Sequence, residues 1–243
     1  MKCVKVERIA AGLAMKLADI VISEIVEPEY EDPIKLKYSR MRLPIALRFI
    51  DLDKFKIVKP INERIYDVGF IARLEQEKGL LEFLCAIKLL HMEGYKLRVF
   101  MGGGGSLLGY AKKFLSENKI DAGVLDYIPH REVPRVLNEI KILVLSSKKE
   151  GVPTILLEAL ACGAIPVASK VGGIPWLFNT GGVGILLDSP TCASICRALK
   201  ILLMLKDAEL ENLSNKGRKF IERYLSLHSA IKRYRVLKAL IDD

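Results

Sequence analysis

The sequence has few histidines, tryptophans and cysteines: it contains three, one and five of them in 243 residues. It also lacks a long apolar run. The longest uncharged stretch in the C-terminal half, residues 171–187, contains five glycines, a proline and an asparagine, so it cannot form a membrane-spanning helix. Near the start, Lys5, Glu7 and Arg8 interrupt any apolar segment of the length that a signal peptide needs. We therefore expect neither a signal peptide nor a membrane span.

The odd number of cysteines, in a chain of this length, is not typical of a disulfide framework. Cys192 and Cys196 lie four residues apart, but no second pair and no nearby histidine completes a metal site. We expect small buried thiols in a reducing cytoplasm and no bound metal. The three histidines, His91, His130 and His228, share no pattern, which favours structural roles for them.

Hydrophobic residues make up 51% and charged residues 28% of the chain, which excludes a disordered protein and predicts a packed core. The net charge of +9 is spread evenly. Residues 1–66 hold 13 basic and 10 acidic residues, 67–205 hold 16 and 13, and 206–243 hold 9 and 6, so each segment carries +3. An even spread argues against a nucleic-acid partner, which needs clustered charge. One local exception is 212–241, where eight basic residues face a single acidic one, Glu222.

From about residue 65, short apolar runs alternate with segments of helical periodicity. This alternation is typical of βαβ units, and it predicts an α/β fold in which helices cover both faces of a parallel sheet. Strands are expected at 65–71, 96–101, 123–128, 142–146, 165–168 and 183–187, and helices at 79–91, 107–117, 133–139, 153–161, 191–205 and about 207–241.

The first 66 residues have a different pattern. They predict a helix at 7–17 and a strand at 19–25, followed by an acidic, proline-bearing stretch at 27–33. One helix and one strand cannot bury a core of their own. This segment is therefore expected to dock on the main domain, on a partner or on a second copy of the chain.

One segment has the features of a ligand site. A buried strand is expected to end at Ser146, Gly151 permits a tight turn, and Pro153 stands where a helix begins. In a parallel sheet this is the carboxyl end of a strand, where ligands bind. The free N–H groups and positive dipole of a helix N-terminus suit a phosphate, and Glu158 could reach a sugar hydroxyl beside it.

This segment, together with others in the same order, resembles the C-terminal half of retaining GT-B glycosyltransferases of family 4. The Glu-x7-Glu motif of the family matches Glu150 and Glu158, and its later Gly-Gly matches Gly172 and Gly173. Further family elements are similar to residues 51–55, 72–79, 99–104, 126–129 and 161–167, so the resemblance spans about residues 50–187.

The resemblance implies a Rossmann-like parallel sheet, the C-terminal half of a GT-B fold with an incomplete N-terminal segment. Residues 1–66 would be the remnant of an N-terminal acceptor domain plus a connector. Residues 67–205 would form the nucleotide-sugar-binding domain, and 206–243 the C-terminal helices.

The resemblance also implies a role for each matching residue. Arg73 and Lys78 would bind the diphosphate of a nucleotide sugar and stabilise the departing nucleoside diphosphate, and Glu150 would hold the donor sugar. Glu158 would accept hydrogen bonds from the ribose. No metal or other cofactor is implied. The remaining donor contacts would come from the backbone of Gly102, Gly103, Gly104, Gly151, Val152, Pro153 and Thr154.

Two departures from the family pattern stand out. Trp176 replaces the glutamate that commonly follows Gly-Gly-Ile-Pro, and an indole cannot accept a hydrogen bond. Family members also carry a whole N-terminal acceptor domain, of which residues 7–25 resemble only the last helix and strand. The chain is therefore expected to be truncated or to need a partner chain or a homodimer for full activity.

Three alternatives stay open at this point. The chain could be a non-catalytic nucleotide-sugar-binding module or relic domain. A dinucleotide-binding oxidoreductase is disfavoured because Leu107 occupies the last glycine position of its fingerprint. The basic stretch 212–241 could pack its apolar stripe on the domain or contact an anionic membrane surface. A lipid-linked or glycan acceptor and a cytoplasmic location, with or without peripheral membrane contact, complete the expectations.

Overall fold

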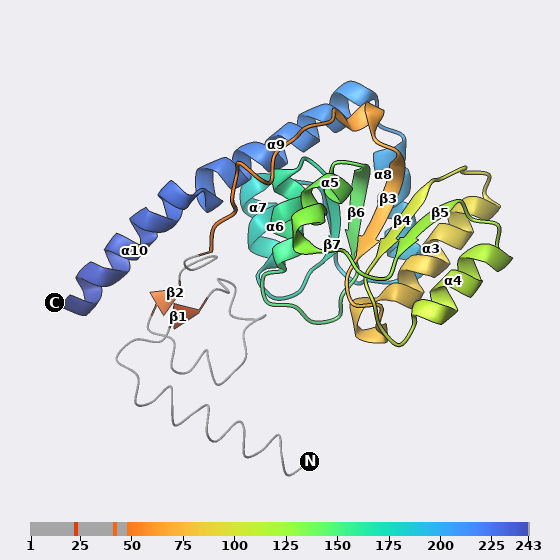
Figure 1. Cartoon of the computed structure of the whole chain (residues 1–243), viewed down its shortest axis with the longest axis horizontal. Helices are drawn as coiled ribbons and strands as arrows, with labels where there is room; N and C mark the ends of the chain where they lie inside the picture. The colour runs from red at the N-terminus through yellow and green to blue at the C-terminus, as the bar shows by residue number, and fades with distance from the viewer. Residues whose placement is uncertain (1–21, 24–40, 43–47, 243) are drawn as a thin grey trace, which may run out of the picture.

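The structure of the chain, a computed structural model, describes residues 22–23, 41–42 and 48–242. Six strands form its main sheet, and helices lie on both sides of it (Figure 1). The strands are β3 (Tyr66–Ile71), β4 (Val99–Gly102), β5 (Ala122–Leu125), β6 (Ile140–Leu145), β7 (Ile165–Ser169) and β8 (Ile185–Leu187). The helices are α3 (Leu80–Met92), α4 (Leu108–Glu117), α5 (Val133–Leu137), α6 (Thr154–Ala161), α7 (Ile174–Gly181), α8 (Cys192–Leu203), α9 (Asp207–Leu225) and α10 (Leu227–Asp242).

Successive residues of β6 belong to two separate hydrophobic clusters. Ile142 and Val144 pack with residues of α3 and α8, whereas Leu143 and Leu145 pack with residues of α5, α6 and α7. Side chains alternate between the two faces of a strand, so each cluster marks one covered face of the sheet. Short apolar strands that are buried on both faces are typical of parallel sheets. The predicted α/β architecture is confirmed.

The strand order β5-β4-β3-β6-β7-β8, with all neighbours parallel, fixes where ligands can bind. The chain moves outward from β3 through β4 to β5, and then returns to add β6 on the other side of β3. The direction of winding therefore reverses between β3 and β6. In open parallel sheets, the crevice at the carboxyl ends of these two strands is the ligand site.

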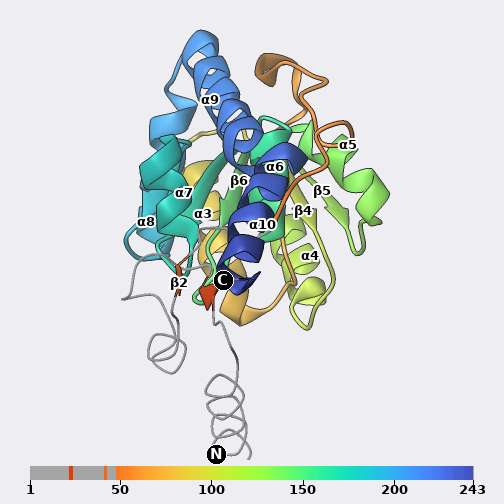
Figure 2. The same ribbon diagram turned by 90° about the vertical axis from the view of Figure 1, so that its left-hand side faces the viewer.

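The C-terminal region differs from the sequence prediction in two places. Helix α7 forms inside 171–187, where no helix was predicted; Pro175 in its first turn and Gly182 at its C-cap, with φ of 58°, define its ends. The predicted helix at 207–241 is interrupted at Ser226, whose ψ of 156° is extended. The Ser226 hydroxyl accepts a hydrogen bond from the Ser229 N–H and so caps α10. Figures 1 and 2 show α9 and α10 as an arm that runs along the domain and past the sheet.

Only two short strands are described in the N-terminal segment. β1 (Ile22–Ser23) pairs in parallel with β2 (Met41–Arg42), and β1 lies inside the strand predicted at 19–25. The helix predicted at 7–17 and the stretch at 27–33 lie outside the described residues. Over the described ranges, none of the helices combines the length and the apolar character that crossing a membrane requires.

A buried arginine ties the connector to strand β6 and to the C-terminus of α6. The guanidinium of Arg64, which is 3% exposed, donates hydrogen bonds to the carbonyl oxygens of Lys59 (3.1 Å), Ile140 (2.9 Å) and Cys162 (2.8 Å). Burial lowers the pKa of Arg64 to about 10, so the side chain keeps its charge at neutral pH. The three carbonyls replace the water that a buried cation loses.

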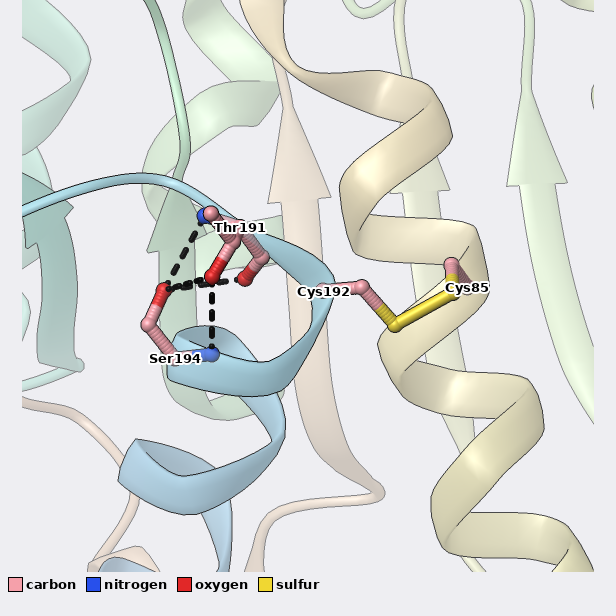
Figure 3. Close-up of a disulfide and its surroundings, with 4 residues drawn as sticks. All are labelled: Cys85, Thr191, Cys192 and Ser194. Atoms are coloured by element: carbon pink, nitrogen blue, oxygen red, sulfur yellow. Dashed lines mark hydrogen bonds between the residues drawn. A yellow bond between two sulfur atoms is a disulfide. The ribbon is translucent and has the colours of Figure 1, made fainter.

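The expectation of free thiols is wrong for two cysteines. Cys85 of α3 and Cys192 of α8 form a disulfide whose Cα atoms are 5.6 Å apart (Figure 3). The bond sits at the first residue of α8, next to a capping box in which Thr191 Oγ1 accepts from the Ser194 N–H (3.2 Å). The two cysteines are 107 residues apart, so counting and spacing gave no sign that they pair. Cys162 and Cys196 are free and buried, as expected.

We predict that the disulfide adds about 3 to 5 kcal/mol to the free energy of unfolding, because it closes a long loop in the unfolded chain. Urea denaturation of the wild type and of the double variant Cys85→Ser/Cys192→Ser measures the difference. A reductant should lower the stability of the wild type to that of the variant and leave the variant unchanged. Equal stability of wild type and variant without reductant would contradict the prediction.

Candidate functional site

The loops that follow β3 and β6 meet at the switch point of the sheet. Lys78 ends a 3-10 turn (η3, Gln76–Lys78) after β3, and its Nζ lies 2.7 Å from Oε1 of Glu150 in the loop after β6. Both side chains are largely buried, at 17% and 16% exposed. The structure therefore brings two of the three predicted catalytic residues together as an ion pair, at the predicted edge of the sheet.

The backbones of these two loops are also joined. Lys148 N–H donates to the Glu77 carbonyl (2.9 Å), and the Ser146 hydroxyl donates to the Gly79 carbonyl (2.9 Å). Gly79 has φ of 74°, and a Cβ there would overlap the Ser146 carbonyl. Only glycine permits this approach without strain. The Lys78–Glu150 pair is thus fixed by the contact between the loops that carry it.

The N–H groups at the start of α6 follow Glu150 directly in the chain and have no hydrogen-bond acceptor among the described residues. Gly151, Val152 and Thr154 donate no backbone hydrogen bond to any described residue. Pro153, the N-cap, has no N–H to donate. The Gly151 carbonyl accepts from the Gly173 N–H (2.9 Å), which supports the loop from below. Free N–H groups at a helix N-terminus suit an anion or a polar ligand.

Arg73 is not part of the ion pair. Its side chain is 66% exposed, and its guanidinium pairs with Glu77 of the same loop. It borders a cavity of about 190 Å³ at the carboxyl ends of β3, β4 and β5. The residues around this cavity are Ile71, Ala72, Arg73, Gly102, Gly103, Gly104, Asp126, Tyr127, Ile128 and Val133. Arg73 and three of the predicted glycines, Gly102, Gly103 and Gly104, therefore line one cavity, whose lining includes neither Lys78 nor Glu150.

The structure gives the glycine turn a function that the sequence did not indicate. The turn lies directly on the loop after β3: Ala72 N–H donates to the Gly102 carbonyl (3.1 Å), and Leu74 N–H donates to the Gly104 carbonyl (2.8 Å). At Gly103, where φ is 126°, a Cβ would overlap the Ala72 carbonyl. Glycine is thus required here for the contact between two loops of the chain itself.

Glu158 lies in the second turn of α6 and is 4% exposed. Its Oε1 is 2.8 Å from Nε2 of His130, which belongs to a 3-10 turn (η4, His130–Glu132) after β5. Burial raises the pKa of the Glu158 carboxyl, and the hydrogen bond and charge of His130 act against that rise. Sequence reasoning had expected only a structural role for His130. Its position directly after the family-like element 126–129 was the one signal that could have drawn attention to it.

Trp176, which replaces a family glutamate, is used in packing. Its indole lies 5.6 Å from the ring of Phe220 and 5.8 Å from that of Tyr224, measured between ring centroids. The contact with Tyr224 is edge-to-face and that with Phe220 is tilted, and aromatic pairs at these distances stabilise packing. Because both partners belong to α9, this position joins α7 to the C-terminal arm.

A parallel sheet of this order, with charged loops at its switch point, is a Rossmann-like α/β domain. Comparison with known proteins gives the family. The family model described as glycosyl transferases group 1 matches residues 51–220, which is more than half of the chain. The chain belongs to this family.

Curated relatives are longer than this chain. A D-inositol 3-phosphate glycosyltransferase of Paenarthrobacter aurescens (strain TC1) is 30% identical over 162 residues, which cover 60% of this chain and 40% of that protein. An N-acetyl-alpha-D-glucosaminyl L-malate synthase of Bacillus anthracis is 23% identical over 198 residues, covering 73% and 51%. The chain spans about half the length of these relatives or less.

Solved structures show the same fold. Sucrose-phosphate synthase from Thermosynechococcus elongatus matches with a TM-score of 0.79 at 18% identity, over 98% of this chain and 62% of that one. Anabaena Alr3699/HepE, in complex with UDP and glucose, gives 0.76 at 14%, over 97% and 66%. The C-terminal domain of a group 1 family protein (LpcC) from Francisella tularensis gives 0.63 at 19%, over 73% and 99%. The predicted GT-B resemblance is confirmed at the level of fold.

We predict that Gly103→Ala destabilises the domain by about 2 kcal/mol or more, because it combines a left-handed backbone with a steric overlap. Gly109→Ala is the matched control: nothing lies within 4 Å of a Cβ there, and the residue is in α4. The control should be stabilised by about 0.5 to 1 kcal/mol, as expected for Ala over Gly in a helix. Urea denaturation of both variants checks the contrast, and equal effects would rule out the loop contact as its cause.

Proposed function

We propose that the chain is the donor-binding half of a retaining glycosyltransferase, which transfers a sugar from a nucleoside-diphosphate sugar to an acceptor. The observation that carries the proposal is the Lys78–Glu150 ion pair at the switch point, with the free N–H groups of Gly151, Val152 and Thr154 beside it. Family membership supports the reaction class. One structural neighbour, HepE, was solved in complex with UDP and glucose, which supports a nucleotide-sugar donor.

In the proposed reaction, the bond between the anomeric carbon and the diphosphate oxygen breaks, and its electron pair leaves on the diphosphate. Lys78 would stabilise that negative charge, and Arg73 would add a second cation from the rim of the neighbouring cavity. Glu150 would hold the donor sugar through its hydroxyls while it fixes the Lys78 ammonium. Glu158 would accept hydrogen bonds from the ribose. The acceptor hydroxyl oxygen forms the new bond to the same face of the sugar, and its proton passes to the departing diphosphate oxygen.

The acceptor half is the second part of the proposal. We propose that the chain acts together with a partner chain or a second copy, and that the acceptor is lipid-linked or a glycan. The chain spans about half the length of these curated relatives or less. A radiolabelled donor tests this directly. Product formed only after another polypeptide is added supports a split enzyme, and full activity of the isolated chain would contradict it.

The alternative is a non-catalytic nucleotide-sugar-binding module. It would make the same donor contacts and would fail to transfer sugar to any acceptor. This alternative would be favoured over the enzyme if the chain binds the donor but no sugar transfer is detected in any assay, with or without a partner.

We predict that Lys78→Ala weakens donor binding by about 10- to 100-fold, the equivalent of one lost charge-assisted hydrogen bond. Calorimetric titration with UDP-, GDP- and ADP-sugars measures the affinity. Lys59→Ala is the matched control, since Lys59 forms an ion pair of the same length (2.7 Å) with Glu139. Glu139 directly precedes β6, so this pair lies at the amino ends of the strands, away from the switch point. The control should bind the donor as the wild type does. Absence of binding to all three donors by the wild type would overturn the proposed function.

A membrane-surface contact through 212–241 is also proposed, with α10 as its main element. In the described part of α10, Leu227, Ile231 and Tyr234 are between 42% and 55% exposed, and no acidic residue lies between 227 and 239. Exposed apolar side chains on a basic helix suit an anionic lipid surface. The basic residues of this helix are Lys232, Arg233, Arg235 and Lys238. The cytoplasmic location expected from the sequence stays a prediction.

We predict that the chain floats with vesicles that contain phosphatidylglycerol and not with vesicles of phosphatidylcholine alone. Lys232→Glu/Lys238→Glu should abolish flotation, because it reverses two charges of α10. Lys112→Glu/Lys113→Glu in α4 changes the net charge equally and should leave flotation intact. Equal flotation of both double variants would contradict a contact through α10.

A further inference from the structure

The contact between His130 and Glu158 joins three parts of the domain. His130 stands at the start of η4, Glu158 is in α6, and the His130 ring packs on Phe55 of the connector, with ring centroids 5.6 Å apart. Phe55 is 3% exposed and provides a fixed surface for the ring. The outer side of the ring reaches solvent, since the His130 side chain is 74% exposed. An exposed histidine is therefore held in one position by an aromatic ring and a carboxylate.

The two oxygens of the Glu158 carboxylate have different surroundings. Oε1 is bound to His130 Nε2 at 2.8 Å. Oε2 accepts no hydrogen bond from any described residue. It nevertheless keeps some contact with solvent, because the fully buried side-chain atoms that lack a hydrogen-bond partner do not include it. A nearly buried carboxylate thus has one oxygen held by the protein and one that remains open to a ligand.

We propose that His130 is a positioning residue for the donor: it holds Glu158 in place and ionised, with Oε2 directed to the hydroxyls of the bound ribose. This inference rests on the proposed function, because it assigns a purpose to the Glu158–ribose contact. His130 itself touches Glu158 and Phe55 and acts through the carboxylate.

The charge state of Glu158 connects this geometry to pH. A ribose hydroxyl donates a charge-assisted hydrogen bond to an ionised carboxylate, which is roughly twice as strong as the bond to a protonated carboxyl. Burial raises the pKa of Glu158, and His130 lowers it again through its hydrogen bond and its charge. Removing His130 leaves only the effect of burial, so the carboxylate would take up a proton at a higher pH. When His130 is lost, the fall in donor affinity at acid pH should therefore begin at a higher pH.

Other charged groups lie around the His130 ring but do not replace it as the partner of Glu158. They line a groove of about 700 Å³ between the connector and α5. Among charged groups, His130 is the one that lowers the Glu158 pKa. Burial raises the pKa of the Cys162 thiol to about 12, and the charge of Glu158 adds to that rise. The thiol therefore stays neutral from pH 5 to 8. The charged residues of the groove are Lys54, Lys59, Arg131, Arg135 and Glu139.

A first experiment needs no ligand. Infrared difference spectra follow protonation of Glu158, identified by the carboxylic-acid band that disappears in Glu158→Gln. The midpoint should be about one pH unit or more higher in His130→Ala than in the wild type, a tenfold change in the protonation equilibrium. His91→Ala, which changes an exposed histidine in α3, should leave the midpoint unchanged. An unchanged or lower midpoint in His130→Ala would overturn the proposal.

A second experiment measures donor affinity by calorimetry from pH 5 to 8. At the upper end, His130→Gln, which can donate to Oε1 without a charge, should bind as the wild type does. At the lower end, His130→Ala should bind about tenfold more weakly than the wild type. His130→Gln, which keeps the hydrogen bond to Oε1 and loses the charge, should bind with an affinity between the two. Parallel pH profiles for all three proteins would overturn the role of His130 in donor binding.

The two experiments separate failure of this inference from failure of the proposed function. If the wild type binds no donor at any pH, the proposed function is wrong and the ribose role of Glu158 falls with it. The infrared midpoint still decides whether His130 keeps Glu158 ionised. If the donor binds and both profiles are unaffected by His130→Ala, only the inference is overturned.

Discussion

The contact between the loops after β3 and β6 is the constraint on which the rest of the site depends. The winding of the sheet reverses between these strands, so their carboxyl ends leave a crevice that no crossover helix covers. The loops close on each other through backbone hydrogen bonds, and the Lys78–Glu150 ion pair lies across the junction. Helices α3 and α6 begin directly after the two loops, which gives the site the rigidity of the sheet core. Removal of either charge would leave the other largely buried and unpaired, which is strongly destabilising.

Much of the fold could be predicted from the sequence because parallel strands bury both faces. The apolar runs at 65–71 and 165–168 became β3 and β7 nearly residue for residue. Helix α7 could not be predicted in this way, because its glycine-rich flanks weaken the helical pattern, and contacts such as Trp176 with Phe220 stabilise it from outside. The break at Ser226 depends on a single serine cap in an otherwise continuous periodic pattern. The disulfide joins residues 107 apart, a distance over which spacing carries no information.

The candidate site, like the fold, could be predicted only in part. Lys78 and Glu150 were predicted from ordered motifs, and the structure pairs them. Arg73 was predicted with them but lies on the exposed rim of the neighbouring cavity. The contact of His130 with Glu158 could not be predicted, because the two residues are 28 positions apart and neither marks the other in the sequence. The glycine turn was expected to admit a ligand, whereas Gly103 is already required by its contact with Ala72. Ordered motifs identify residues of one site, and they do not give the contacts that each side chain makes within it.

We propose above all that the switch-point crevice binds a nucleoside diphosphate. The most direct measurement is a crystal structure of the chain soaked with the nucleoside diphosphate that binds in titration. We predict the diphosphate within hydrogen-bond distance of Lys78 Nζ and the N–H groups of Gly151, Val152 and Thr154, and the ribose at Glu158 Oε2. A nucleotide bound instead in the groove between the connector and α5, with the switch-point loops empty, would contradict it.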